Sequence, residues 1–183
     1  MPAILKHVAS IGIKFKGVSM KIESKTVVQF HYRLRDEKAD IEMESSYGGD
    51  PIAYLHGFGN IIKGLETAMV GHEKGDIFSV TLEAKNAYGE RNEEKQQRVP
   101  MKHLHVKKNA KLTPGDVVNI QTNNGVTQAT VIKAGKFNVD VDTNHPLAGK
   151  TLAFDVEIVN VRAAKEEEVK HKHAHGVGGH HHE

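Results

Sequence analysis

Apolar and polar residues alternate along several segments of the chain, and this period of two is typical of strands with one buried face. The clearest segments are residues 27–34, 77–82 and 152–158. A shorter strand is expected at residues 41–44, after a polar turn. The pattern predicts an antiparallel sheet whose apolar side chains lie on one face.

One helix is predicted between these strands, where apolar residues recur at helical spacing after Asn60. The side-chain oxygen of Asn60 is expected to cap the first turn, and Gly71 to end the helix. Gly64 lies inside the helix at a cost of roughly 1 kcal/mol relative to alanine, so we expect close packing of the helix on the sheet to offset it. The apolar residues are Ile61, Ile62, Leu65, Ala68 and Met69.

The segment between Gly89 and the last strand has a different character. Thr113-Pro114-Gly115-Asp116 indicates a tight turn, and Asn123-Asn124-Gly125 is typical of a β-hairpin. Few of its residues are large and apolar, so a core of this size would be marginal alone. We interpret the segment as a small all-β domain inserted into the first one. Its strands are expected at residues 118–122, 126–132 and 137–141.

The chain thus has an α+β architecture that is mainly β, in four parts. The parts are an extension at 1–19, a discontinuous main domain at 20–92 and 144–163, the inserted β domain at 93–143, and a tail at 164–183. Polar junctions near residues 90–97 and 143–145 are expected to act as hinges. The extension is basic, and the alternative is a true start at Met20. The tail is charged and then rich in His and Gly, which predicts disorder.

Composition narrows the classes of partner. The 183-residue chain has a net charge of +2 and balanced acidic and basic residues, so no nucleic-acid partner is expected. The absence of cysteine excludes disulfides, thiol nucleophiles and thiolate metal sites, and fits a reducing compartment. The chain contains no apolar run near the roughly 20 residues that cross a bilayer, so no membrane is expected. We expect a soluble, cytoplasmic protein that is monomeric by default.

Several sequence runs stand out in a fixed order along the chain. The longest is YLHGFGNIIKGLETAM at residues 54–69, continued by GHEKGD at 71–76. The later runs are NAYG at 86–89, QRVP at 97–100 and NHPLAGKTLAF at 144–154. In this order, the runs resemble the signature of the SlyD-type FKBP peptidyl-prolyl cis-trans isomerases, a bacterial group with an inserted domain and a His-rich tail. The resemblance covers about residues 21–162.

The resemblance implies an FKBP-like bent antiparallel sheet wrapped on one helix, with an aromatic pocket between them. Many relatives have Phe-Asp at the pocket rim where this chain has Met43-Glu44, which keeps an apolar side chain and a carboxylate. In the family, the insert replaces the flap over the pocket and binds unfolded polypeptide. By position, the catalytic residues are Tyr32, Met43, Glu44, Tyr54, Ile61, Ile62, Leu65, Tyr88 and Phe154.

A pocket of this kind suits rotation about an X-Pro bond, whose barrier is roughly 18–20 kcal/mol because amide resonance must be broken. No bond is made or broken, so a site complementary to the twisted amide suffices and no cofactor is required. In the resemblance, Leu65, Phe154 and Tyr32 form the floor and walls. The Ile62 backbone N–H and the Tyr88 hydroxyl meet the rotated carbonyl.

The predicted function is therefore prolyl isomerisation in unfolded or proline-containing polypeptides, with chaperone activity from the insert. One alternative is a holdase-type binding module with weak catalysis. Another is a nickel- or zinc-binding metallochaperone, because neutral imidazoles in the tail suit these ions. The candidate metal ligands are His171, His173, His175, His180, His181 and His182.

Overall fold

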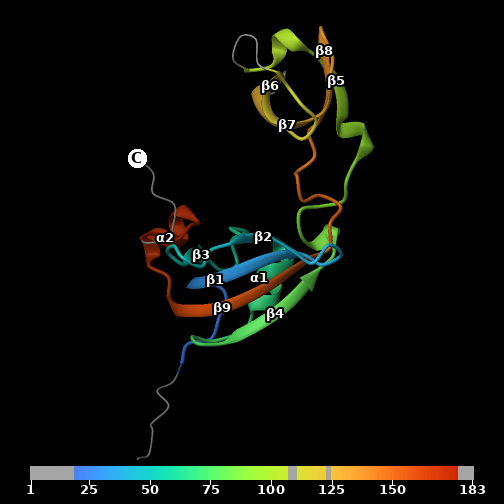
Figure 1. The fold of residues 1–183 in the computed structure, drawn as a ribbon. Coiled ribbons are helices and arrows are strands. Elements are labelled where there is room, and N and C mark those ends of the chain that lie inside the picture. Colours follow the sequence, from blue (N-terminus) through green and yellow to red (C-terminus); the bar gives the residue numbers. More distant parts are fainter. Residues whose placement is uncertain (1–18, 107–110, 123–124, 177–183) are drawn as a thin grey trace, which may run out of the picture.

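The chain folds into two antiparallel sheets that stand apart and are joined by two crossing segments, as Figure 1 shows. A computed structural model describes residues 19–106, 111–122 and 125–176. The predicted extension therefore lies outside the described residues, apart from Ser19. None of the helices in these described ranges is long and apolar enough to cross a membrane.

The larger sheet has five strands in which β1 is central. Strand β1 pairs with β9 along its whole length, while its other edge is shared by β3, at Val27–Phe30, and β2, at Arg33–Asp36. Strand β4 pairs with the far edge of β9. The strands predicted at residues 27–34, 41–44, 77–82 and 152–158 are confirmed, whereas the strand at residues 52–55 was not predicted. The strands are β1 (Thr26–Asp36), β2 (Ile41–Ser45), β3 (Ile52–Leu55), β4 (Ile77–Leu82) and β9 (Leu152–Ala163).

One helix packs on this sheet and completes its core. The helix α1 (Lys63–Met69) buries Leu65 and Met69 among the apolar side chains of the strands. A Cβ added to Gly64 would lie 2.5 Å from the carbonyl oxygen of Asn86 and 2.9 Å from a methyl carbon of Leu82. The close packing predicted at this glycine is therefore confirmed.

The start of α1 differs from the prediction. Ile62 is extended, with ψ at 136°, so the helix begins only at Lys63 and Asn60 lies too early to cap it. The Asn60 side chain instead accepts a hydrogen bond from the Leu55 N–H at 3.1 Å and donates to the Lys172 carbonyl at 2.9 Å. The N-cap prediction is wrong, whereas the helix does end just before Gly71, whose φ is +83°.

The smaller sheet lies within the predicted insert and has the strand order β5-β8-β7-β6. The predicted hairpin is confirmed, because Thr122 and Gly125 pair across it. The junction expected as a hinge at residues 90–97 is already strand at Gln96, where β5 begins, so that prediction is wrong for its last residues. The strands are β5 (Gln96–Pro100), β6 (Val117–Thr122), β7 (Gly125–Ala134) and β8 (Asn138–Asp142). Short 3₁₀ helices are η1 (Ala84–Asn86), η2 (Glu93–Lys95) and η3 (Met101–His103).

The prediction of a disordered tail is wrong as far as residue 176, where the described part ends. A second helix, α2 (Glu166–His171), follows β9, and the fully buried Glu168 accepts hydrogen bonds from both terminal nitrogens of Arg162 at 2.7 and 2.8 Å. Ala174 is buried against Val27 and Leu55 of the larger sheet. The charged run therefore folds because its one buried carboxylate is paired, which the composition does not reveal.

Candidate active site

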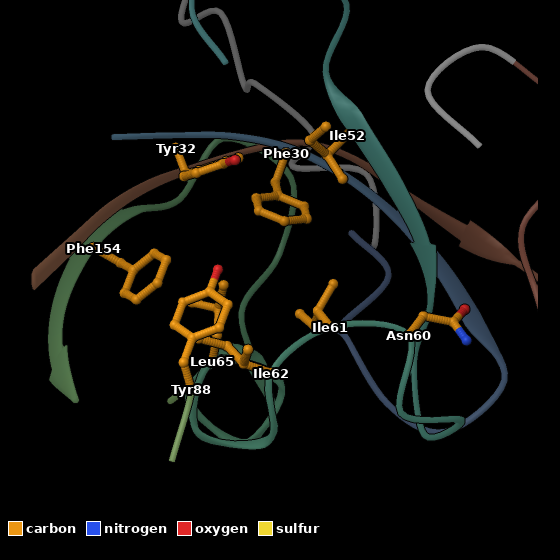
Figure 2. A pocket seen from close by; sticks show the side chains of 9 residues that line it. All are labelled: Phe30, Tyr32, Ile52, Asn60, Ile61, Ile62, Leu65, Tyr88 and Phe154. Atoms are coloured by element: carbon orange, nitrogen blue, oxygen red, sulfur yellow. The ribbon is translucent and has the colours of Figure 1, made fainter. Parts of the chain in front are cut away.

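A cavity of about 470 Å³ opens between the larger sheet and the segment that carries α1. Figure 2 shows Tyr32, Phe30 and Ile52 on one side of it and Ile61, Ile62, Leu65 and Tyr88 on the other, with Phe154 at one end. Asn60 completes the lining at the opposite end. Its wall is almost entirely apolar or aromatic.

Strands and helix together fix the floor of the cavity. Phe30 on β1 and Phe154 on β9 are each 2% exposed, and Leu65 on α1 is 4% exposed. The Tyr32 ring lies between the two phenylalanines, with ring centroids 5.9 Å from Phe30 and 6.3 Å from Phe154. Because these side chains come from elements that pair or pack along their length, the floor is held rigidly.

The Tyr32 hydroxyl is held at the rim by a carboxylate. It donates a hydrogen bond of 2.5 Å to Oε1 of Glu44 on β2. Burial, followed by this hydrogen bond and the charge of Glu44, raises the pKa of Tyr32 well above its ordinary value. The phenol is therefore neutral across the physiological range, and its orientation is set by Glu44.

Tyr88 faces Tyr32 from the loop that follows η1. Burial, and to a smaller extent the negative charge of Glu44, raises the pKa of Tyr88 above its ordinary value. In Figure 2 the hydroxyl of Tyr88 points into the cavity. A neutral phenol in this position can donate a hydrogen bond to a carbonyl oxygen bound in the cavity.

The residues predicted for the site fall into two groups. Tyr54 lies beneath the cavity, where its hydroxyl hydrogen-bonds with Nδ1 of His56 at 2.9 Å and Sδ of Met69 at 3.0 Å, and Met43 is 42% exposed on β2. These two residues do not line the wall, and neither does Glu44, which accepts the hydrogen bond of the Tyr32 hydroxyl. The predicted residues that do line it are Tyr32, Ile61, Ile62, Leu65, Tyr88 and Phe154.

Sequence reasoning missed three lining residues, Phe30, Ile52 and Asn60. The alternation of β1 places Phe30 on the same face as Tyr32, so Phe30 could have been predicted to line the cavity. No comparable pattern marks Ile52, which begins a four-residue strand. The side chain of Asn60 is positioned by contacts with Leu55 and Lys172, distant in sequence in the second case.

A separate group of side chains at the end of α2 has the composition of a metal site. The ligand nitrogens of His171, His173 and His175 all lie within 4.8 Å of one another. Glu168 helps to place them, because its Oε1 accepts the His175 backbone N–H at 2.8 Å. The other predicted ligands, His180 to His182, lie outside the described residues.

The bent antiparallel sheet, the single helix packed on it and the aromatic cavity between them define a prolyl isomerase of the FKBP class. Residues 18–159 match the family model described as FKBP-type peptidyl-prolyl cis-trans isomerase. The chain belongs to this family, and the predicted enzyme class is confirmed.

Relatives named "FKBP-type peptidyl-prolyl cis-trans isomerase SlyD" match most of the chain. The protein of Escherichia coli (strain K12) is 41% identical over 158 residues, which cover 86% of this chain and 79% of the relative. The protein of Aeromonas hydrophila is 39% identical over 160 residues, covering 87% and 74%. The protein of Pasteurella multocida is 37% identical over 168 residues, covering 90% and 83%.

Proposed function

We propose that prolyl isomerisation takes place in the aromatic cavity, with the proline ring against Phe154, Leu65 and Phe30. The observation that carries this proposal is an almost wholly apolar wall with one neutral phenol on each side. Such a wall removes water that would favour the planar, polar amide. It binds the twisted amide better than either planar form, which is what acceleration requires.

The rotated carbonyl of the substrate needs hydrogen-bond donors that are not already engaged. Within the described residues, the backbone N–H of Ile62 has no hydrogen-bond partner, and the same is true of the Tyr88 hydroxyl. The Ile62 N–H is free because the residue lies just before the first turn of α1. We therefore assign these two groups as donors to the twisted carbonyl, with Tyr32 as an oriented wall.

The test is the refolding of a protein whose slow step is trans-to-cis isomerisation of a proline bond, followed by fluorescence at sub-stoichiometric enzyme. A Phe154→Ala variant that stays folded should lose most of the acceleration. Val156→Ala is the matched control, because Val156 is 1% exposed on the same face of β9 but does not line the cavity. Equal activity of both variants would refute the assignment of the cavity.

We further propose that the inserted sheet captures unfolded polypeptide and delivers its proline bonds to the cavity. Apolar side chains stand exposed on this sheet and its turns, among them Val126 at 58% and Phe137 at 72%. A capture surface on the same chain raises the effective concentration of proline bonds near the catalytic site. Replacing residues 96–142 by a short flap should weaken acceleration of protein refolding much more than isomerisation of a short peptide.

A second function, binding of Ni²⁺ or Zn²⁺, is supported by the geometry of the tail. Three imidazoles whose ligand nitrogens lie within 4.8 Å of one another supply the nitrogen ligands that both ions accept. Replacing His171, His173 and His175 with alanine leaves the Glu168 anchor in place and should weaken Ni²⁺ binding measured by calorimetry. Replacing His180 to His182 instead shows how far the remaining histidines contribute. If the first variant binds Ni²⁺ as the parent chain does, the three-histidine site is excluded.

A further inference from the structure

His145 connects the inserted sheet to the wall of the cavity. It lies between the last residue of β8 and the start of β9, and its ring stacks on that of Tyr88 with centroids 4.2 Å apart and an interplanar angle of 8°. Resting on the catalytic cavity proposed above, we propose that His145 is a positioning residue for prolyl isomerisation, holding Tyr88 in the orientation that meets the rotated carbonyl.

Tyr88 lies on a loop and is only partly buried where it packs against the core of the larger sheet, so a further contact helps to set its ring orientation. The backbone around it is set by the turn at η1, where the N–H groups of Ala87 and Gly89 donate to the Ala84 carbonyl at 3.0 and 2.8 Å. The hydroxyl has no hydrogen-bond partner among the described residues. A tyrosine ring on a loop turns about two side-chain bonds, so contact with a flat neighbour decides where the hydroxyl points.

His145 is itself held in place, first by the turn that follows it. Its Nδ1 accepts the backbone N–H of Leu147 at 3.1 Å, and the Ala148 N–H donates to its carbonyl at 2.9 Å. The contact with Leu147 identifies Nδ1 as the acceptor, which leaves the proton of a neutral ring on Nε2. The imidazole ring is thus held by a hydrogen bond at its edge in addition to the stack on Tyr88.

Asn144, the residue before His145, forms hydrogen bonds that link the two chain segments connecting the sheets. Asn144 is 6% exposed; its side chain accepts the Asn92 N–H at 3.0 Å and donates to the Asn92 carbonyl at 2.8 Å. The same amide donates to Oδ1 of Asp142 at 2.7 Å, and the other oxygen of Asp142 is paired with Arg91. We call Arg91, Asn92, Asp142 and Asn144 the junction clamp.

The junction clamp makes the stack a rigid extension of the inserted sheet. Asp142 is the last residue of β8, so only two residues lie between this strand and His145, whose ring stacks on Tyr88. The predicted hinge at residues 143–145 is therefore linked by hydrogen bonds to Asn92, in the segment that leads from the larger sheet to β5. If the stack orients a donor that acts on the twisted amide, its loss lowers kcat and leaves KM nearly unchanged.

The experiment compares substitutions that separate the two contacts of His145. His145→Phe keeps a flat ring on Tyr88 but lacks the acceptor for Leu147, whereas His145→Asn keeps an acceptor and loses the ring. We expect kcat on a short proline peptide to fall roughly five- to tenfold in His145→Asn and His145→Ala, with KM within about twofold, and to recover in His145→Phe. His31→Ala removes another histidine–tyrosine stack, with Tyr47 at 4.9 Å, and is the control for loss of such a stack elsewhere.

The results separate this inference from the cavity proposal. If Phe154→Ala loses activity while all three His145 variants keep kcat, the positioning role is wrong and the cavity stands. Activity retained in Asn and lost in Phe means that the turn at Leu147 matters and the stack does not, which also overturns the inference. Full activity in Phe154→Ala overturns both. The ring-proton NMR shifts of Tyr88 report the stack independently, and they should change in Asn and Ala but less in Phe.

Discussion

The two sheets of the molecule bury apolar side chains of different kinds. The larger sheet buries phenylalanines, a tyrosine and long aliphatic side chains against a helix. Several of these side chains and their neighbours also line the cavity. The inserted sheet has a core of valine, leucine, isoleucine and alanine, without an aromatic side chain in the described part. Large apolar residues are exposed in both domains, such as Phe137 and Val126 in the insert and Ile77 on β4 of the larger sheet.

The two proposed tasks, catalysis of amide rotation and capture of unfolded chains, need surfaces with different properties. Catalysis of amide rotation needs a closed, preformed site that excludes water, because the interactions must favour one twisted geometry. Capture of unfolded chains needs scattered, accessible apolar side chains that accept many sequences. In the function proposed above, two sheets joined by the junction clamp would give each task its own surface and keep the captured chain near the cavity.

The largest effect is expected from breaking the enclosed side of this comparison. In a Tyr88→Phe, Phe154→Ala double variant, both a carbonyl donor and the apolar wall behind the proline ring are lost. We expect kcat/KM on a short proline peptide to fall roughly 100-fold, which corresponds to about 2.7 kcal/mol of transition-state stabilisation. Retention of full activity by the folded double variant would show that the chemistry takes place elsewhere.

The second effect concerns the ion pair between Glu168 of α2 and Arg162 of β9 in the larger sheet. Arg162, by hydrogen bonds to both carboxylate oxygens, and the N–H groups of His175 and Lys165 lower the pKa of Glu168 to about 2, against the opposing effect of burial. We expect Glu168→Gln to lower the free energy of unfolding by about 2 kcal/mol, since the paired charge is removed and Arg162 loses its partner. Urea unfolding measures this, with the exposed Glu167→Gln as control.

The sign of the pH dependence follows from the lowered pKa. Because the folded state holds Glu168 ionised more strongly than the unfolded chain, its contribution is fully present above the ordinary pKa of 4.5 and is lost as pH falls toward about 2. The parent chain should therefore lose on the order of 1–3 kcal/mol more than Glu168→Gln over this window. An identical acid profile for the two proteins would contradict the role of this pair.

The third effect compares the contribution of exposed apolar residues in the insert and on the larger sheet to the binding of an unfolded client. Replacing Val126 and Phe137 of the insert with serine should weaken binding of an unfolded client about tenfold, or about 1.4 kcal/mol. Isomerisation of a short peptide should change by less than about twofold, because it needs only the cavity. Ile77→Ser is the matched control, since Ile77 is 75% exposed on β4 of the larger sheet. Fluorescence titration with a permanently unfolded protein compares them, and equal losses would contradict a capture surface on the insert.

The same contrast explains what could be predicted from the sequence. The larger sheet follows a period of two along β1, β4 and β9, and the family resemblance located six of the nine residues that line the cavity. Strand β5 has no such period, because Gln96, Gln97 and Arg98 are exposed and their strand conformation depends on pairing with β8, including the ion pair of Arg98 with Asp140. Local pattern thus predicts elements that bury side chains and misses those defined by their partners.

The functional contacts that escaped prediction depend on distant partners in the same way. Glu168 lies in a run of charges that is typical of a solvated tail, and its burial follows from Arg162 on the preceding strand. His145 lies in the run NHPLAGKTLAF at 144–154 that contributes to the family resemblance, but nothing in that run assigns it a role. Its importance appears only when Tyr88, far from it in sequence, is brought into contact with its ring.

The smallest effect is expected at Gly64, where local preference and packing oppose each other. Alanine is favoured over glycine in a helix by about 1 kcal/mol. A Cβ at this position would, however, lie 2.5 Å from the Asn86 carbonyl oxygen, so α1 must move away from β4 and η1. Overpacking of this kind costs about 1–3 kcal/mol, so we expect Gly64→Ala to destabilise the chain by about 1 kcal/mol net. Thr67→Ala, exposed on the same helix, should not destabilise it in this way, and a Gly64→Ala variant more stable than the parent in urea would show that the helix has room to shift.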